Sequence, residues 1–233
     1  MVIGSGLLAQ VFSPVFLHRE DVCIYAAGVS NSNCNDSQEF LRERRCLANA
    51  LQEKRHTRGF VYFGTCSVAD SEANKTPYVE HKIAMEQLVA THPDYLILRL
   101  PQIAGNTFNP NTLLNFLRTQ ILRGESFSLW SKAKRNIIDV DDVLSIAREL
   151  IDNDSLRNVT VNVASPRSHF IAEIVREMEC AMGKRAIYEV VDRGSEYPID
   201  ISAILPLVER AAVNFGDNYL KRVVEKYYGK VSL

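Results

Sequence analysis

The sequence predicts an α/β fold in which helices cover both faces of a parallel sheet. Short apolar runs alternate with stretches of helical period through the first two thirds of the 233 residues, as β-α-β units do. Apolar residues make up 46% of the chain, which is enough material for a sizeable core. We therefore expect a doubly wound parallel sheet, with a small C-terminal α/β lobe against its carboxyl edge.

Each element follows from its residue pattern. Buried parallel strands appear as unbroken apolar runs, which predict strands near residues 1–4, 22–27, 59–63, 95–100, 136–140 and 160–163, and a short one near 187–191. Apolar residues three or four apart predict helices near residues 6–17, 36–54, 77–91, 110–123, 141–153, 168–183, 202–213 and 217–228. We expect residues 1–165 to form the core, with part of a cleft at 105–135, and residues 166–233 to form the lobe.

The first strand runs into a glycine-rich turn. Gly4-Ser-Gly6-Leu7-Leu8-Ala has the Gly-x-Gly-x-x-Ala spacing, in which the first glycine permits a tight turn. The second lets backbone amides approach a pyrophosphate at the helix N-terminus. The spacing predicts a Rossmann-like nucleotide site with Gly4, Gly6, Leu7 and Leu8 as cofactor contacts, and a plain tight turn is the alternative.

The segment after this helix departs from the usual dinucleotide-binding arrangement. A complete fold continues with a strand that ends in an acidic residue about 20 residues on. Here His18 to Asp21 leads straight into the next apolar run, although a parallel crossover needs roughly a dozen residues. We expect the sheet to be truncated at the adenosine side by roughly two strands. Arg19 or Glu20 could contact the adenosine instead, and a solvated loop is the alternative.

Thr65, twelve residues, then Tyr78-Val-Glu-His-Lys82 is a pattern that predicts an acid–base site. Helical residues four apart share a face, so the Lys82 ammonium can lie beside the Tyr78 phenol. At about 4 Å this favours phenolate by about 4 kcal/mol, which predicts a Tyr78 pKa lowered towards neutrality. Thr65 would hold the reacting oxygen at a strand end. An ordinary exposed helix is the alternative, and we expect His81 at the surface.

Three further segments carry a family resemblance: Ala26-Ala27-Gly28, Arg99 to Gly105, and Arg135 to Asp142. With the glycine turn and the Thr65/Tyr78/Lys82 set, the chain resembles the extended short-chain dehydrogenase/reductases, and more narrowly the NAD-dependent epimerase/dehydratase group that acts on nucleotide sugars. The resemblance covers roughly residues 1–165.

This resemblance implies roles for individual residues. Tyr78 would be the general acid/base, Lys82 would tune it and bind the nicotinamide ribose, and Thr65 would hold the substrate oxygen. NAD or NADP would also contact Ala26, Ala27, Gly28, Pro101 and Ile103. The nucleotide-sugar substrate would contact Ser67, Asn111, Asn115 and Arg135. For Arg135, which lies near Lys132 and Lys134, a solvated face is the alternative.

The resemblance also narrows the reaction. Members of the family that eliminate water typically place an Asp-Glu pair directly after the threonine, where this chain has Cys66-Ser67. We therefore expect 4-epimerisation through a transient ketone, or reduction of a keto-sugar. The competing class is a non-catalytic nucleotide or nucleotide-sugar binding or regulatory protein that kept the fold, which the missing strands motivate.

Composition sets further limits. A net charge of −1 provides no electrostatic footprint for nucleic acid or an anionic membrane surface. No segment reaches the roughly 18 uninterrupted apolar residues of a membrane span, and the N-terminus lacks the basic start of a signal peptide. Five scattered cysteines predict reduced thiols and a cytoplasmic location.

The acidic residues around position 140 invite a metal interpretation. We expect none, because Asp141 reads as a helix N-cap with Asp142 in the first turn. The resemblance further implies a homodimer through the helices near 36–54 and 77–91, and a place in surface-polysaccharide synthesis.

Overall fold

The central feature of the computed structural model, which describes residues 1–70, 76–153 and 157–229, is a five-stranded sheet. Its order is β1-β2-β3-β4-β8, and every neighbouring pair is parallel. The strands are β1 (Val2–Ile3), β2 (Val22–Tyr25), β3 (Gly59–Thr65), β4 (Tyr95–Leu100) and β8 (Val159–Asn162). The predicted α/β fold with a parallel sheet is therefore confirmed.

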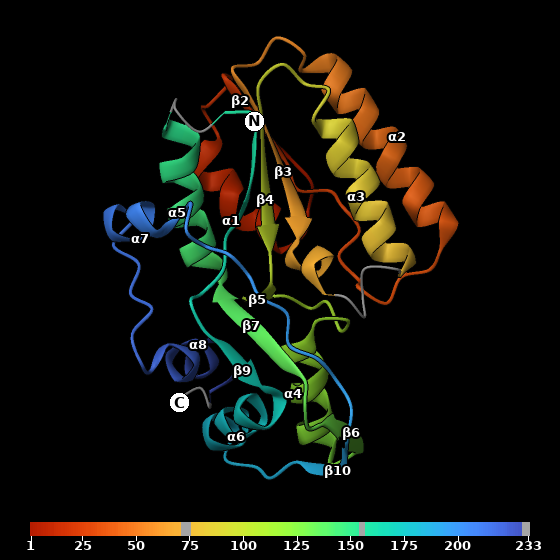
Figure 1. The fold of residues 1–233 in the computed structure, drawn as a ribbon, viewed down its shortest axis with the longest axis vertical. Coiled ribbons are helices and arrows are strands. Elements are labelled where there is room, and N and C mark those ends of the chain that lie inside the picture. The colour runs from red at the N-terminus through yellow and green to blue at the C-terminus, as the bar shows by residue number, and fades with distance from the viewer. Residues whose placement is uncertain (71–75, 154–156, 230–233) are drawn as a thin grey trace.

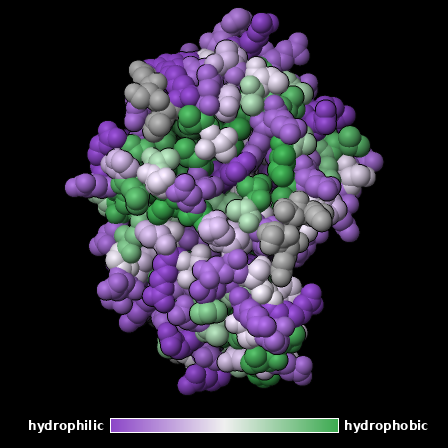
Figure 2. All heavy atoms as spheres, viewed as in Figure 1, coloured by the Kyte–Doolittle hydropathy of each residue, from purple (hydrophilic) through white to green (hydrophobic). Residues whose placement is uncertain are grey.

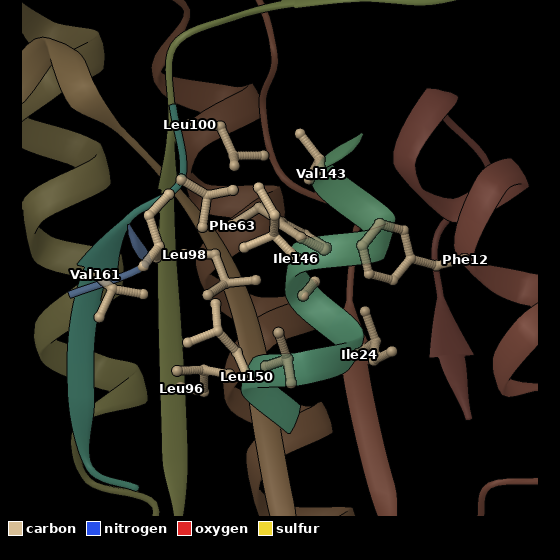
Figure 3. Packing of buried hydrophobic residues seen from close by; sticks show 14 of the residues in the cluster. Phe12, Ile24, Phe63, Leu96, Leu98, Leu100, Val143, Ile146, Leu150 and Val161 are labelled. Carbon is tan, nitrogen blue, oxygen red and sulfur yellow. The ribbon is translucent and has the colours of Figure 1, made fainter. Parts of the chain in front are cut away.

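Helices cover both faces of this sheet (Figure 1). On one face lie α1 (Leu7–Phe16) and α5 (Val140–Asp152), and on the other lie α2 (Ser37–Glu53) and α3 (Pro77–Val89). Alternate strand residues point to opposite faces, so Ile24 packs with α1 and α5 while its neighbour Tyr25 packs with α2. Figure 3 shows the first of these cores, in which Phe12 of α1 and Ile146 of α5 meet Phe63 of β3.

The first crossover of the sheet has the opposite hand from the next two. β1–α1–β2, β2–α2–β3 and β3–α3–β4 all advance across the sheet in one direction, yet α1 lies on the face opposite to α2 and α3. Parallel crossovers are right-handed in about 98% of cases. The two crossovers through α2 and α3 therefore have this usual hand, and β1–α1–β2 is left-handed. Residues 17–21 alone join α1 to β2, and β1 is left as the edge strand of the sheet.

The lower part of the molecule in Figure 1 has two small sheets. One contains β5 (Gln102–Ala104), β7 (Lys134–Asp139) and β9 (Ser168–Phe170), and the other pairs β6 (Ser126–Trp130) with β10 (Ile187–Val191). The strand expected near 136–140 is β7, so it belongs here rather than to the central sheet. The sequence patterns missed β5, β6, β9 and the short 3-10 helix η1 (Cys66–Ala69).

A second apolar core fills this lower part. It combines side chains from residues 104–137 with others from residues 171–228, including those of α4 (Leu113–Arg123), α6 (Ile171–Met182) and α8 (Tyr219–Tyr228). The short helix α7 (Leu205–Arg210) instead packs on α5. Figure 2 shows the face of the molecule seen in Figure 1, on which apolar side chains gather in the upper half and again at the lower end. Across the described ranges, no helix is long and apolar enough to cross a membrane.

The acidic run before α5 caps that helix, two residues earlier than expected. Asp139, not Asp141, is the N-cap, because the helix already begins at Val140 and the Asp139 carboxylate accepts from the Asp141 amide at 2.9 Å. The Lys226 ammonium donates to the carboxylates of Asp139 and Asp141, each at 2.7 Å. Within the described part of the chain, no group of three or more His, Cys, Asp or Glu side chains could hold a metal ion.

Candidate active site

A cavity of about 440 Å³ opens at the carboxyl ends of β1 to β4. This is the edge of a parallel sheet at which ligands bind. The fold brings most of the residues predicted from the sequence to its lining: Gly4, Gly6, Leu7, Leu8, Ala26, Ala27, Gly28, Thr65, Tyr78, Lys82, Pro101, Ile103 and Asn111.

The glycine turn forms one wall of this cavity in a conformation that suits a phosphate. Gly4 has a φ of +138°, and a Cβ there would lie 2.4 Å from the Ala26 carbonyl oxygen, so a side chain cannot be placed at this turn. A Cβ at Gly6 would meet none of the described atoms within 4 Å. Gly6 is also the N-cap of α1 and has no side chain to accept from the first amides of that helix. These amides can bind an anion.

The suggested adenosine contacts, Arg19 and Glu20, follow the C-terminal end of α1. Arg19 donates to Asp21 at 2.8 Å and to Asp152 at 2.9 Å, at the end of α1 that leads into β2 and away from the glycine turn. Both Arg19 and Glu20 lie outside the cavity lining that the described residues form. The suggestion that they contact adenosine is therefore wrong. With β1 at the sheet edge, the residues fit the phosphates and the nicotinamide end of a dinucleotide but not its adenosine end.

Thr65 and Tyr78 meet at the centre of the cavity. Thr65 is the last residue of β3, and Tyr78 lies in the first turn of α3, a helix capped by Thr76. Their hydroxyl groups are hydrogen-bonded. Thr65 also accepts from the Ser67 amide at 3.2 Å, which starts η1 and fixes the threonine hydroxyl at the strand end.

The expected lowering of the Tyr78 pKa is wrong. Burial, together with the negative charge of Glu43, raises the pKa of Tyr78 well above its ordinary value, and the hydrogen bond with Thr65 opposes this rise. Lys82 directs its ammonium to the carboxylate of Glu43 at 3.2 Å and to the Tyr62 hydroxyl at 3.0 Å. The lysine is thus partnered by a carboxylate from α2, a residue that the spacing of α3 could not reveal.

His81 is also buried, contrary to the expectation that it lies at the surface. Its side chain is 9% exposed, its Nε2 lies 2.9 Å from the second carboxylate oxygen of Glu43, and its ring stacks on Phe40 at 4.4 Å. The reason is that α3 packs against the sheet with one side and against α2 with another. A residue that points off the Tyr78–Lys82 face therefore meets α2 rather than water.

The proposed substrate contacts are spread around one end of the cavity. Asn111 lines it, whereas Asn115 uses its side-chain amide to donate to the carbonyls of Thr107 and Asn109, both at 2.8 Å. Asn115 therefore shapes the loop that carries Asn111. Ser67 and Arg135 lie outside the described lining, and Arg135 donates to the Lys134 carbonyl at 2.7 Å.

Tyr197 joins these two residues, and the sequence patterns missed it. Its ring is buried, and its hydroxyl is hydrogen-bonded to Ser67. Burial raises the pKa of Tyr197, and the positive charge of Arg135 opposes this rise. The segment that carries it is held nearby through Ser195, which donates to Asp70 at 3.2 Å. Residues 192–200 have no helical or strand periodicity, so nothing in the sequence singles out this tyrosine.

Cys66 is the first of the two positions after Thr65 at which the resemblance would place a carboxylate in an enzyme that eliminates water. The thiol is 1% exposed and lies 3.3 Å from the Arg99 carbonyl oxygen. Burial raises the pKa of Cys66 to about 12, so this thiol stays protonated at neutral pH.

Residues 16–164 match the family model described as the NAD dependent epimerase/dehydratase family. No curated protein matches the sequence. Among solved structures, the enzyme WbmH of Bordetella bronchiseptica in complex with NAD+ superposes with a TM-score of 0.72 at 17% identity, covering 95% of this chain and 78% of that one.

Two further solved structures have a similar fold. UDP-glucose 4-epimerase of Thermus thermophilus in complex with NAD gives a TM-score of 0.70 at 16% identity, covering 96% of this chain and 83% of that one. UDP-glucuronic acid 4-epimerase of Bacillus cereus in complex with UDP-glucuronic acid and NAD gives 0.67 at 17% identity, covering 91% and 78%. At these identities the similarity shows a shared fold alone.

Proposed function

The chain belongs to the NAD-dependent epimerase/dehydratase family, and on this premise we propose that it is an NAD- or NADP-dependent oxidoreductase or epimerase of a nucleotide-activated sugar. The observation that carries the proposal is the convergence of Thr65, Tyr78 and Lys82 on the cavity that the glycine turn also lines. The similar structures solved with NAD and with UDP-glucuronic acid support it.

The roles of the three residues follow from their chemistry. The nicotinamide cofactor supplies or accepts a hydride at the carbon of a sugar hydroxyl or ketone. Tyr78 exchanges the matching proton with the oxygen on that carbon, and Thr65, already hydrogen-bonded to Tyr78, holds the same oxygen. Lys82 offers its buried ammonium to the nicotinamide ribose beside Gly28.

The reaction we favour is keto-sugar reduction or 4-epimerisation through a ketone, since each needs one hydride carrier and one proton-exchanging group. Elimination of water needs a separate acid and base, and the Cys66 thiol stays protonated. Gly4, Gly6, Leu7 and Leu8 would bind the diphosphate of the cofactor. Ala26, Ala27, Gly28, Pro101 and Ile103 would complete its pocket, and Ser67, Asn111, Asn115 and Arg135 would bind or shape the site of the nucleotide sugar.

A second candidate is a non-catalytic protein that binds a nucleotide or nucleotide sugar. The position of β1 at the sheet edge favours it, because the half of the fold that holds adenosine in a dinucleotide-binding sheet is not present among the described strands. Against it, a protein without chemistry has little physical reason to keep a buried lysine and a buried tyrosine beside the same cavity.

Cofactor binding separates the two candidates. Under the enzyme proposal, NADH or NADPH gains fluorescence with the protein and raises its melting temperature, since a ligand at 100 times its Kd stabilises the folded state by about 2.7 kcal/mol. Tyr78→Phe then keeps cofactor binding but loses turnover of a keto-sugar nucleotide. Turnover that persists in Tyr78→Phe contradicts the assignment of Tyr78, and a lack of response to both cofactors contradicts the enzyme proposal.

The expected setting of the protein adds two further proposals. We propose a cytoplasmic homodimer that associates through α2 and α3, with a role in surface-polysaccharide synthesis. Leu41, which is 58% exposed on α2, provides apolar surface for such a contact. Sedimentation of the purified protein tests the dimer, and Leu41→Lys should shift it towards monomer.

A further inference from the structure

Glu43 is a fully buried carboxylate directly behind the candidate active site. It comes from the middle of α2 and its exposed fraction is 0%. One oxygen accepts from the Tyr62 hydroxyl at 2.8 Å and from the Lys82 ammonium at 3.2 Å. The other accepts from the Val29 amide at 2.6 Å and lies 2.9 Å from Nε2 of His81. A carboxylate with this set of partners is held in one position.

The surroundings keep Glu43 ionised despite its burial. Burial alone raises the pKa of a carboxyl group, but His81, Lys82 and the amide of Val29 together outweigh it and hold the pKa of Glu43 at about 2. Lys82 shows the complementary effect, because its burial lowers its pKa and Glu43 opposes that change. Each charge of this pair therefore depends on the other.

The pair also lies where it can act on the cavity. A Cβ at Gly28 would be 2.7 Å from Nζ of Lys82 and 2.8 Å from the nearer Glu43 oxygen, so both groups press against the backbone that lines the cavity. Gly28 therefore lies between Glu43 and the cavity, whereas Lys82 itself lines the cavity beside Gly28. The lysine ammonium is held beside Gly28 by its hydrogen bond to Glu43.

We propose that Glu43 is a positioning residue of the active site, whose buried carboxylate fixes the Lys82 ammonium under the cavity and keeps Tyr78 a neutral phenol that donates a proton. The inference rests on the proposed function and gives Tyr78 the protonation state that ketone reduction needs, a phenol that acts as the acid. Tyr78 would give its phenol proton to the carbonyl oxygen, and NADH or NADPH, when bound, would supply the hydride for the carbonyl carbon. The C=O group becomes CH–OH, and the tyrosinate recovers its proton from water.

The charge balance around Tyr78 supports this protonation state. Burial raises the pKa of Tyr78, and the negative charge of Glu43 raises it further. Without Glu43, the Lys82 ammonium would be left uncompensated and would favour tyrosinate. The ionisable and charged groups around Tyr78 and its partners are Glu43 from α2, Tyr62 from β3, His81, Lys82 and Glu86 from α3, and Tyr197. Of these groups, Lys82 carries the fixed positive charge nearest to Glu43.

The test measures the ionisation of Tyr78 without any cofactor. Tyrosinate absorbance is recorded against pH for the full-length protein and for Glu43→Gln, and the same curves for the matching Tyr78→Phe variants are subtracted. At about pH 10, where an ordinary tyrosine is half ionised, we expect Tyr78 to remain protonated in the unchanged protein. In Glu43→Gln, its ratio of tyrosinate to phenol should rise about tenfold or more, which is one pKa unit.

Controls make each outcome decisive. Glu43→Asp keeps the carboxylate and should retain the ionisation curve of the unchanged protein. Equal Tyr78 ionisation in a folded Glu43→Gln overturns the proposal. If Glu43→Gln does not fold, the double variant Glu43→Gln/Lys82→Met, which removes both charges, should melt above either single variant. A double variant that melts no higher than the weaker single overturns it too.

Failure of the proposed function appears in a different experiment. The ionisation curves need no ligand, whereas the function requires NADH or NADPH to bind. A protein that binds neither cofactor but shows the Glu43-dependent change in Tyr78 contradicts the function alone. Cofactor binding together with unchanged Tyr78 ionisation contradicts the role of Glu43 alone.

Discussion

The hydroxyl group of Tyr197 is hydrogen-bonded to Ser67, and this contact ties the C-terminal part of the chain to the carboxyl end of β3. Ser67 follows the strand that ends at Thr65, while Tyr197 lies in an irregular segment after β10. The positive charge of Arg135 also acts on Tyr197 and opposes the rise in pKa that burial causes. The contact therefore joins a distant segment of the chain to the residues that follow Thr65.

We expect Tyr197→Phe to lower the free energy of unfolding by about 0.5–1.5 kcal/mol, the usual contribution of one hydrogen bond. Urea unfolding followed by circular dichroism measures this change. Tyr188→Phe on β10 is the matched control, because Tyr188 is 41% exposed and its change should stay within about 0.5 kcal/mol. Equal effects of the two substitutions would show that the Tyr197 hydroxyl adds nothing to the free energy of unfolding.

Gly28→Ala should disturb the ion pair behind the cavity. The added methyl group would overlap both Lys82 and Glu43, so we expect a loss of about 1–3 kcal/mol in unfolding free energy and weaker cofactor binding. Gly59→Ala is the control, since the nearest atom to a Cβ there is 3.7 Å away in Val22. Thermal melting and NADH fluorescence measure both effects. A Gly28→Ala protein that melts and binds like the unchanged one would show that the wall tolerates a side chain.

The depressed pKa of Glu43 predicts acid sensitivity. A carboxyl group that titrates at about 2 when folded and at its ordinary 4.5 when unfolded stabilises the protein above pH 4.5 and loses this contribution as the pH falls towards 2. The full contribution is on the order of 3 kcal/mol, most of which is lost at about pH 3. Urea unfolding at about pH 7 and pH 3 should therefore show a smaller difference for Glu43→Gln than for the unchanged protein. A parallel pH dependence in both would exclude Glu43 as its source.

The central sheet and its helices follow from the sequence because each has a regular period and enough length. The three-residue strands β5 and β9 do not, since they contain no repeat that a period could detect. The helix expected near residues 77–91 is α3, and its residues Tyr78 and Lys82 both line the cavity.

What packs against that helix was beyond the sequence. Glu43 belongs to a highly charged helix, and its partners Tyr62, His81 and Lys82 lie on other elements. Residue spacing within one helix predicts a shared face but not the charge that faces it. Burial of Tyr78 and the facing charge of Glu43 raise its pKa instead of lowering it, although Tyr78 lines the cavity as expected.

The position of β1 at the sheet edge predicts an unusual cofactor preference. Gly4, Gly6 and the start of α1 can bind phosphate, but no described strand lies beyond β1 to bind adenosine. We therefore expect reduced nicotinamide mononucleotide to bind within about tenfold of NADH, a difference of about 1.4 kcal/mol, in a fluorescence titration. Gly6→Asp is the control: its carboxylate would repel the phosphate that both ligands carry, so both affinities should fall together. If NADH binds about a thousandfold more tightly than the mononucleotide, the adenosine must be held by a surface outside this sheet, and a second copy of the chain becomes the first place to look for it.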